Sequence, residues 1–350
     1  MEHSRHEGAT VQSVTERYSA AAFEREEALC CPVDYDPKYL KIIPQEVLDR
    51  DYGCGDPSTY VRSGETVLDL GAGGGKICFI AAQIVGPEGK VIGVDMNDDM
   101  LELSRSAQPT VVEQLGYDNI EFRHGRIQDL MTDLDALDSW LSARPAKSAA
   151  DYKDLEAHLA KSRQTHPLIT NDSIDVVISN CVLNLVSDDE KPHLFQEIFR
   201  VLKPGGRIAI SDIVSDKDSP EHLKNDPELW SGCISGALTE KGFADALSQA
   251  GFAGVRLDKL EQTPWQVVED IEYRSATYVA HKPSDTAMTD EEIEVIYTGP
   301  WERVTDEIGL TYERGERIKV RGTDANRLRS GAYADHFVIF GEENDSNSCC

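Results

Sequence analysis

Three cysteines lie in loop-like stretches of the sequence, where a thiol could do chemistry. Cys181 lies in "ISNCVLNL", with asparagines on either side, Cys233 lies in "LWSGCISGAL", and Cys54 lies in "DYGCGDP". A thiolate is a soft ligand and binds soft or borderline metals and metalloids. Taken singly, each cysteine is more typical of a small buried hydrophobic residue. Taken together, the three predict a thiolate site.

A glycine-rich loop indicates a second ligand. In "TVLDLGAGGGK" an apolar run ends in Asp69 and Leu70, and Gly71, Gly73 and Gly75 follow. Small residues there let a ligand approach the backbone closely. A carboxylate at the end of the run suits a cationic amine better than a pyrophosphate. The loop therefore favours S-adenosylmethionine (SAM) over NAD.

Later segments complete this expected cofactor site. Asp95 ends the second apolar run, roughly 25 residues after the glycine loop, where an acid accepts hydrogen bonds from ribose hydroxyls. Met96 would pack against the adenine, and Ile127 and Gln128 would line and hydrogen-bond the base. We also assign Asn180 to the cofactor. The alternative is a similar sheet that binds another nucleoside.

Five apolar runs must position these residues, and helical stretches alternate with them. The runs are Thr66–Leu70, Lys90–Met96, Ile120–Gly125, Ser173–Asn180 and Arg207–Val214. This alternation predicts an α/β fold with a doubly wound, mainly parallel Rossmann-like sheet. We expect the helix before the fifth run to end at Pro204, Gly205 and Gly206. Ligands bind at the carboxyl ends of such strands, so we expect Cys181 at the opening of the cofactor site.

Shifts in composition divide the chain into five parts. Residues 1–60 form a lead-in with Cys30, Cys31 and Cys54, and residues 61–218 form the cofactor domain. Residues 131–171 are a helical insertion that could act as a lid. Residues 219–285 are the expected substrate region, 286–341 a small β-rich domain, and 342–350 a flexible tail with two further cysteines.

The charge and apolar pattern exclude several classes of partner. The 350-residue chain has a formal net charge of -28, which disfavours nucleic acids and anionic membranes. Its apolar runs are shorter than the ~20 residues that span a bilayer, and its polar start does not resemble a signal peptide. We therefore expect a cytoplasmic protein without structural disulfides. The absence of a C-x-x-C pair disfavours an ordinary zinc site.

A methyl donor beside three thiols predicts a particular reaction. The enzyme must place a nucleophile in line with the methyl group and exclude water. Trivalent arsenic is thiophilic and retains a lone pair, so arsenic bound by Cys54, Cys181 and Cys233 can be that nucleophile. Such a complex carries no proton for a base to remove.

The same motifs resemble those of the arsenite methyltransferase family, within the class I SAM-dependent methyltransferases. They are "YGCG", "LDLGAGGG", "VIGVDM", "ISNCVLNL", "RVLKPGG" and "LWSGCISGAL", and the likeness runs from about Cys31 to Phe340. The resemblance implies that Cys181 and Cys233 ligate arsenic. It also implies a redox pair of Cys54 with Cys30 or Cys31, and glutathione or thioredoxin as reductant. Its substrates would be arsenite and methylated arsenicals, with arsenic detoxification as the outcome.

Two other functions compete with this interpretation. The chain could methylate another small molecule, such as a selenium species, a thiol or an organic acceptor. It could instead be a non-catalytic metalloid sensor, but a sensor needs no methyl donor, so the intact glycine loop argues against that role.

Overall fold

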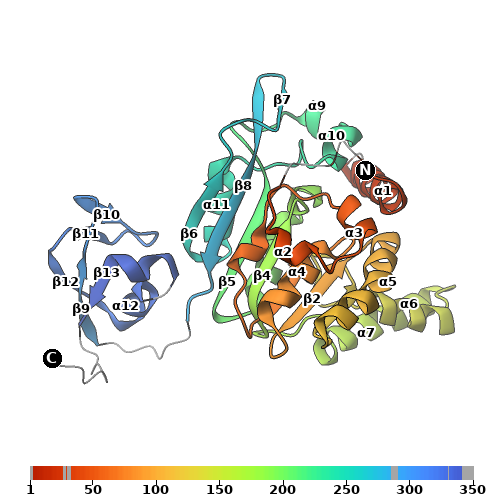
Figure 1. The fold of residues 1–350 in the computed structure, drawn as a ribbon, viewed down its shortest axis with the longest axis horizontal. Helices are drawn as coiled ribbons and strands as arrows, with labels where there is room; N and C mark the ends of the chain where they lie inside the picture. Colours follow the sequence, from red (N-terminus) through yellow and green to blue (C-terminus); the bar gives the residue numbers. More distant parts are fainter. Residues whose placement is uncertain (1–2, 27–28, 30–32, 285–290, 330, 341–350) are drawn as a thin grey trace.

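The computed structural model describes residues 3–26, 29, 33–284, 291–329 and 331–340. Five strands pair in parallel: β1 (Thr66–Leu70), β2 (Lys90–Asp95), β3 (Ile120–His124), β4 (Ile174–Asn180) and β5 (Leu202–Ser215). Antiparallel strands extend this sheet: β6 (Ala253–Leu260), β7 (Gln266–Val268) and β8 (Ile271–His281). The order is β3-β2-β1-β4-β5-β8-β6, with β7 paired to β8 (Figure 1). The predicted fold class is confirmed.

The first four predicted strands agree with the structure to within one residue at each end, whereas the fifth begins earlier than predicted. Helix α8 (Lys191–Val201) ends before the expected Pro204-Gly205-Gly206 stop. Leu202 is already extended and pairs with Ile174 of β4. Lys203 precedes a proline, and such a residue is sterically pushed out of the helical region. The proline therefore ends the helix earlier than its own position suggests.

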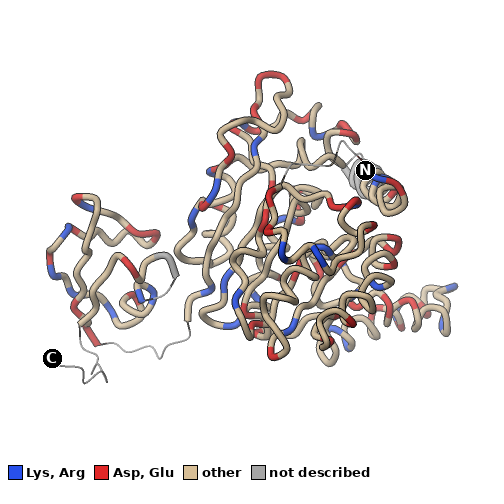
Figure 2. The backbone as a smooth tube through the Cα atoms, in the orientation of Figure 1, with Lys and Arg blue, Asp and Glu red and all other residues tan. Residues whose placement is uncertain are grey.

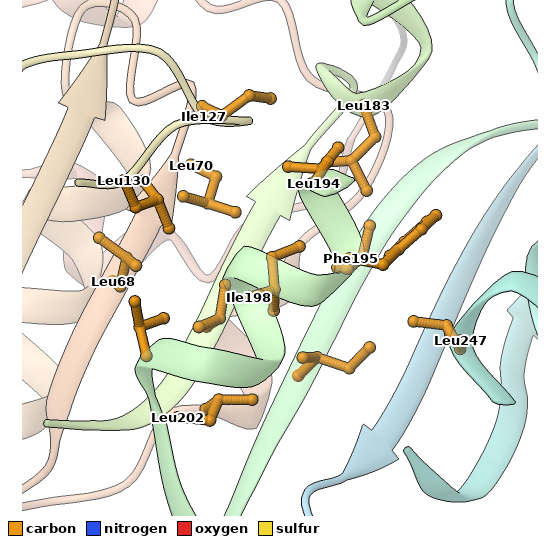
Figure 3. Packing of buried hydrophobic residues seen from close by; sticks show 14 of the residues in the cluster. Leu68, Leu70, Ile127, Leu130, Leu183, Leu194, Phe195, Ile198, Leu202 and Leu247 are labelled. Atoms are coloured by element: carbon orange, nitrogen blue, oxygen red, sulfur yellow. The ribbon is translucent and has the colours of Figure 1, made fainter. Parts of the chain in front are cut away.

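Helices cover both faces of the sheet. Successive side chains of a strand point to opposite faces, so the apolar strands present an apolar surface on each side. On one face Leu68 and Leu70 of β1 pack with Phe195 and Ile198 of α8, and with α11 (Glu240–Gln249) beyond (Figure 3). On the other face Val67 packs with α4 (Lys76–Val85) and α5 (Asp98–Leu115). A doubly wound sheet with two cores results.

The lead-in and the insertion are largely helical. The lead-in contains α1 (His3–Phe23), α2 (Pro37–Leu40), α3 (Gln45–Asp49) and the 3₁₀ turn η2 (Pro57–Tyr60). The insertion forms α6 (Leu134–Ala143) and α7 (Ala149–Thr165), as predicted, and both helices lie at the lower right of Figure 1. Helix α1 of the lead-in packs against α5 and against α10 (Pro227–Ser231).

Short elements complete the chain around the sheet. The turn η3 (Leu183–Leu185) follows β4, and α9 (Glu221–Lys224) precedes α10. The small C-terminal unit contains β9 (Glu292–Tyr297), β10 (Arg303–Thr305), β11 (Thr311–Glu313), β12 (Arg317–Arg321), α12 (Gly322–Leu328), η4 (Gly331–His336) and β13 (Phe337–Ile339). Its sheets are β12-β9-β13 and β10-β11. This unit is β-rich, as expected.

Charge is spread over the whole fold. Figure 2 shows Asp and Glu on the main body and on the C-terminal unit, with Lys and Arg among them. In the part of the chain that the structure describes, no helix combines the length and the apolar character needed to cross a membrane.

Candidate functional site

An open cavity lies at the carboxyl ends of β1 and β4. From β1 the chain adds β2 and β3 on one side of the sheet, and it then crosses back to add β4 and β5 on the other side. Doubly wound folds bind ligands at such a reversal of strand order. Most of the predicted site residues line it: Asp69, Gly71, Gly73, Asp95, Met96, Ile127, Gln128, Asn180 and Cys181. Gly75 is not a lining residue. It caps α4 with a positive φ of 89°, and an added Cβ would lie 2.8 Å from Phe122.

Asp95 closes the glycine loop from the end of β2. Its Oδ2 accepts a hydrogen bond from the Gly73 amide at 2.8 Å, and its Oδ1 accepts one from the Asn97 amide at 2.9 Å. Burial raises the pKa of this carboxyl, although those amides favour its ionised form. Ribose hydroxyls in the cavity would supply further donors to it. The position therefore fits a nucleoside ligand.

Asp69 is a buried acid beside the loop. Loss of solvent raises the pKa of its carboxyl to about 7, although a 3.2 Å hydrogen bond from Cys78 Sγ to Oδ2 lowers it in part. An ammonium group in the cavity would stabilise the ionised carboxylate. The residue thus fits the amine of SAM.

We expect SAM affinity to rise with pH because of Asp69. Below a pKa of about 7 the carboxyl is protonated in the free protein, and it must lose that proton to pair with the ammonium group. Affinity at pH 6 should therefore be about tenfold weaker than at pH 8. Calorimetric titration across this range measures the effect, and Asp69→Asn should flatten it. A flat wild-type profile would contradict the assignment.

A buried cation also reaches the cavity. Lys76 Nζ lies 2.6 Å from Asp51 Oδ2 and 3.6 Å from the centroid of the Tyr35 ring. Both Lys76 and Asp51 line the cavity. The ammonium group could bind a ligand carboxylate such as that of SAM. Lys76 was not among the residues predicted from the sequence, although its position directly after the glycine loop could have indicated it.

The expected base-binding end is more apolar. Met96, Met100 and Ile127 line the cavity there. Gln128 donates a hydrogen bond from Nε2 to Glu190 Oε2 at 3.1 Å, so its amide is shared with the protein. Its expected bond to the base stays a prediction.

The three cysteines of the thiolate site lie in one buried cluster. Cys54, Cys181 and Cys233 pack with Ile213 and Tyr273. Cys54 and Cys181 are joined by a disulfide across 127 residues, so the expectation of no disulfide is wrong. The side chain of Asn180, next to Cys181, binds the Cys54 loop. Its Oδ1 accepts hydrogen bonds from the amides of Cys54 at 2.9 Å and Gly55 at 3.1 Å, and its Nδ2 donates to the Gly55 carbonyl at 2.7 Å.

This disulfide affects how the cysteines can act. Cys54 is joined to Cys181. Cys30 and Cys31 lie outside the described residues, so a redox pair of Cys54 with one of them stays a prediction. Within the described ranges no group of three or more Cys, His, Asp or Glu side chains is arranged to hold a metal ion. Two of the three sulfurs are bonded to each other, so arsenic ligation by all three cysteines requires reduction first.

Both Cys181 and Cys233 have a left-handed backbone, with φ of 60° and 61°. Such angles are unfavourable for residues with a Cβ and often mark functional positions. Buried Asp212 of β5 holds the Cys181 loop, since its Oδ2 accepts from the Leu183 amide at 2.9 Å and its Oδ1 from the Ile213 amide at 2.8 Å. Burial raises the pKa of this carboxyl to about 7.

Asn184 links the two cysteine loops. Its Nδ2 donates to the carbonyls of Ile213 at 2.7 Å and Cys233 at 3.2 Å. The two asparagines around Cys181 therefore have different tasks, since Asn180 holds the Cys54 loop and Asn184 holds the Cys233 loop. Asn180 lines the cavity, but its polar atoms bind the chain. Its assignment to the cofactor stays a prediction.

Helix α1 covers the cavity, in the place expected for the insertion. Val14, Thr15 and Tyr18 line it, and the described lining residues include none from 131–171. The Tyr18 hydroxyl lies 3.8 Å from Cys233 Sγ. No role for α1 was predicted from the sequence. The spacing of Val14 and Tyr18 could have indicated one, because residues four positions apart share one helix face.

Two family profiles match the chain. A methyltransferase domain matches residues 61–159 and 142–263, and a domain of unknown function matches residues 284–347. The first match spans strands β1 to β6 and the segment with Cys233. The second corresponds to the small C-terminal unit.

Curated relatives extend the likeness beyond one domain. The arsenite methyltransferase of Aquipseudomonas alcaligenes is 31% identical over 331 residues, which cover 89% of this chain and 85% of that protein. The Homo sapiens arsenite methyltransferase is 30% identical, over 89% of this chain and 77% of its own length. The Halobacterium salinarum arsenite methyltransferase is 36% identical, over 67% of this chain and 52% of its own length.

A solved structure has the same overall arrangement. It is the arsenic(III) S-adenosylmethionine methyltransferase from Chlamydomonas reinhardtii, with a TM-score of 0.57 and 27% identity. The match covers 92% of this chain and 98% of that one.

Proposed function

The chain belongs to the arsenite methyltransferase family, and from this premise we propose that it transfers methyl groups from SAM to thiol-bound trivalent arsenic. The observation that carries the proposal is the position of the cysteine cluster. Cys181 lines the cavity and shares a buried cluster with Cys54 and Cys233. A thiophilic substrate held there would lie beside the methyl donor.

SAM supplies an activated methyl group when it is bound. The chain would hold it by the groups that line the cavity: Asp95 for the ribose, Asp69 for the amine, Lys76 for the carboxylate, and Met96 with Ile127 for the base. Helix α1 covers the cavity and limits the access of water to it. Excluding water prevents hydrolysis and strengthens the polar contacts inside.

The cysteines prepare the nucleophile. After the Cys54–Cys181 disulfide is reduced, each thiol that binds arsenite releases one proton, and an arsenic-bound hydroxide leaves as water. Arsenic keeps its lone pair in the resulting trithiolate. Cys181 lines the cavity and would hold the arsenic beside it, so the lone pair could attack in line and form the As–C bond as the S–CH3 bond breaks and S-adenosylhomocysteine leaves. The arsenic becomes formally pentavalent in this step, and a thiol reductant would return two electrons to it before the next methylation.

The disulfide also indicates a reducing partner and a reducing compartment. Cys54 and Cys181 must be reduced before they can ligate arsenic, since the thiolate is the ligand form. A thiol reductant such as glutathione or thioredoxin would supply the two electrons and become oxidised to its disulfide. Such reductants are held reduced in the cytoplasm, where we place the reaction. Arsenic detoxification would be its physiological result.

The direct test is product speciation. Purified protein with SAM, glutathione or thioredoxin, and arsenite should yield methylated arsenicals and S-adenosylhomocysteine in proportion. The main alternative is methylation of another small molecule, so selenite and a simple organic thiol are run in parallel. Turnover with one of these and none with arsenite would overturn the proposed substrate.

Asp95→Ala tests the cofactor assignment separately. The variant removes a buried acceptor from the cavity, so SAM binding should weaken by roughly 1–3 kcal/mol, or about 5- to 150-fold. Calorimetric titration measures this. Asp98→Ala is the matched control, because its exposed carboxylate begins the next helix and is not a lining residue. Equal affinity of Asp95→Ala and wild type would exclude the ribose assignment.

A further inference from the structure

Tyr18 of α1 connects the cofactor cavity to the thiol cluster. The residue lines the cavity, and its hydroxyl oxygen lies 3.8 Å from Cys233 Sγ. A phenol hydroxyl carries its proton at neutral pH and can donate a hydrogen bond.

Separate contacts hold α1 in this position. Asn97 Nδ2 donates to the Thr15 carbonyl at 3.3 Å and to Ser19 Oγ at 3.0 Å. Arg17 Nη1 donates to the Glu228 carbonyl at 3.1 Å and to Ser231 Oγ at 3.0 Å, both on α10. The helix is thus fastened to both sides of the site without the Tyr18 hydroxyl, which can serve another purpose.

That purpose follows from the surroundings of Cys233. As a thiol, Cys233 Sγ donates a hydrogen bond to the Cys181 carbonyl at 2.9 Å. Once the thiol loses its proton to bind arsenic, this carbonyl oxygen faces a negatively charged sulfur and repels it. A donor is then required near the same sulfur, and the Tyr18 hydroxyl is in place.

We propose that Tyr18 is a positioning residue of the arsenic site, whose hydroxyl donates a hydrogen bond to the Cys233 thiolate and holds its sulfur at the cofactor cavity. The inference rests on the proposed function and deepens it. It assigns the lead-in helix a part in substrate binding as well as in covering the cofactor. Removing the hydroxyl should weaken arsenite binding and leave SAM binding unchanged, since the ring stays in the cavity wall.

Tyr18→Phe and Arg17→Met separate this role from the docking of α1. Each protein is reduced with a phosphine, because a thiol reductant would compete with the protein for arsenic. It is then titrated calorimetrically with arsenite and, separately, with SAM. Tyr18→Phe should bind arsenite about tenfold more weakly and SAM as wild type does. Arg17→Met loosens α1, so its affinities for arsenite and SAM should fall together.

Two results would overturn the inference. In the first, Tyr18→Phe binds arsenite with wild-type affinity. In the second, it loses affinity for both ligands in parallel, as expected for Arg17→Met, which makes Tyr18 a structural part of the helix. A wild-type protein that binds SAM but no arsenite gives a third, distinct result, which counts against the proposed function itself.

Discussion

Replacing either Cys181 or Cys233 with serine is expected to abolish methylation of arsenite and of methylarsenite. A serine hydroxyl is hard and stays protonated at neutral pH, so it cannot replace a thiolate toward arsenic. Both cysteines are also fixed in place, since Asp212 holds the loop of the first and Asn184 the loop of the second. The remaining sulfur cannot move to compensate. Product speciation with each substrate measures the loss.

Two controls accompany these variants. SAM binding by calorimetry should stay close to wild type, which shows that the sheet and cavity are intact. The double variant at Cys349 and Cys350, which lie outside the described residues, removes as many thiols as two site substitutions. The sequence predicts a far smaller effect for it. Full turnover by either single variant would remove that cysteine from the site.

Cys54→Ser is expected to lose the first methylation and keep the second. Each methyl group occupies one of arsenic's three valences, so inorganic arsenite takes three thiolates and methylarsenite takes two. Cys54 is the third thiol of the cluster, and its position depends on the Asn180 side chain rather than on Asn184. The variant also lacks the disulfide, so Cys181 should stay available as a thiol.

The measurement is product speciation for Cys54→Ser with arsenite and with methylarsenite, under one thiol reductant. Equal failure of both steps would make Cys54 structural or essential for reduction, and the valence argument would be wrong. Unchanged rates for both would leave a site of two thiols.

Much of the cofactor site could be predicted from sequence, because its signals are local. The strand before the glycine loop is apolar apart from Thr66 and Asp69, and Asp95 stands where β2 ends, so alternation and spacing were enough to place both. The same reasoning put Cys181 at the carboxyl end of β4. The end of α8 was missed by a few residues, because Pro204 disfavours a helical Lys203 and Leu202 already pairs with β4.

The rest depends on contacts between distant segments. Cys54 and Cys181 are 127 residues apart, and the Asn180 amide that binds the Cys54 loop beside Cys181 makes contacts that no spacing rule gives. Tyr18 and Cys233 are 215 residues apart and meet only because α1 packs on α10. The polar insertion was the more evident candidate for a lid. Which helix covers the cavity depends on where that helix packs, and the sequence alone does not show this.

The left-handed backbone of Cys181 and Cys233 has an evolutionary consequence. Each angle costs on the order of 1 kcal/mol for a residue with a Cβ, and glycine would relieve that cost. At these two positions the backbone alone would favour glycine, whereas arsenic chemistry requires a thiol. A lineage no longer exposed to arsenic would keep the backbone strain without using the thiols, so selection would no longer hold a cysteine at either position for its chemistry.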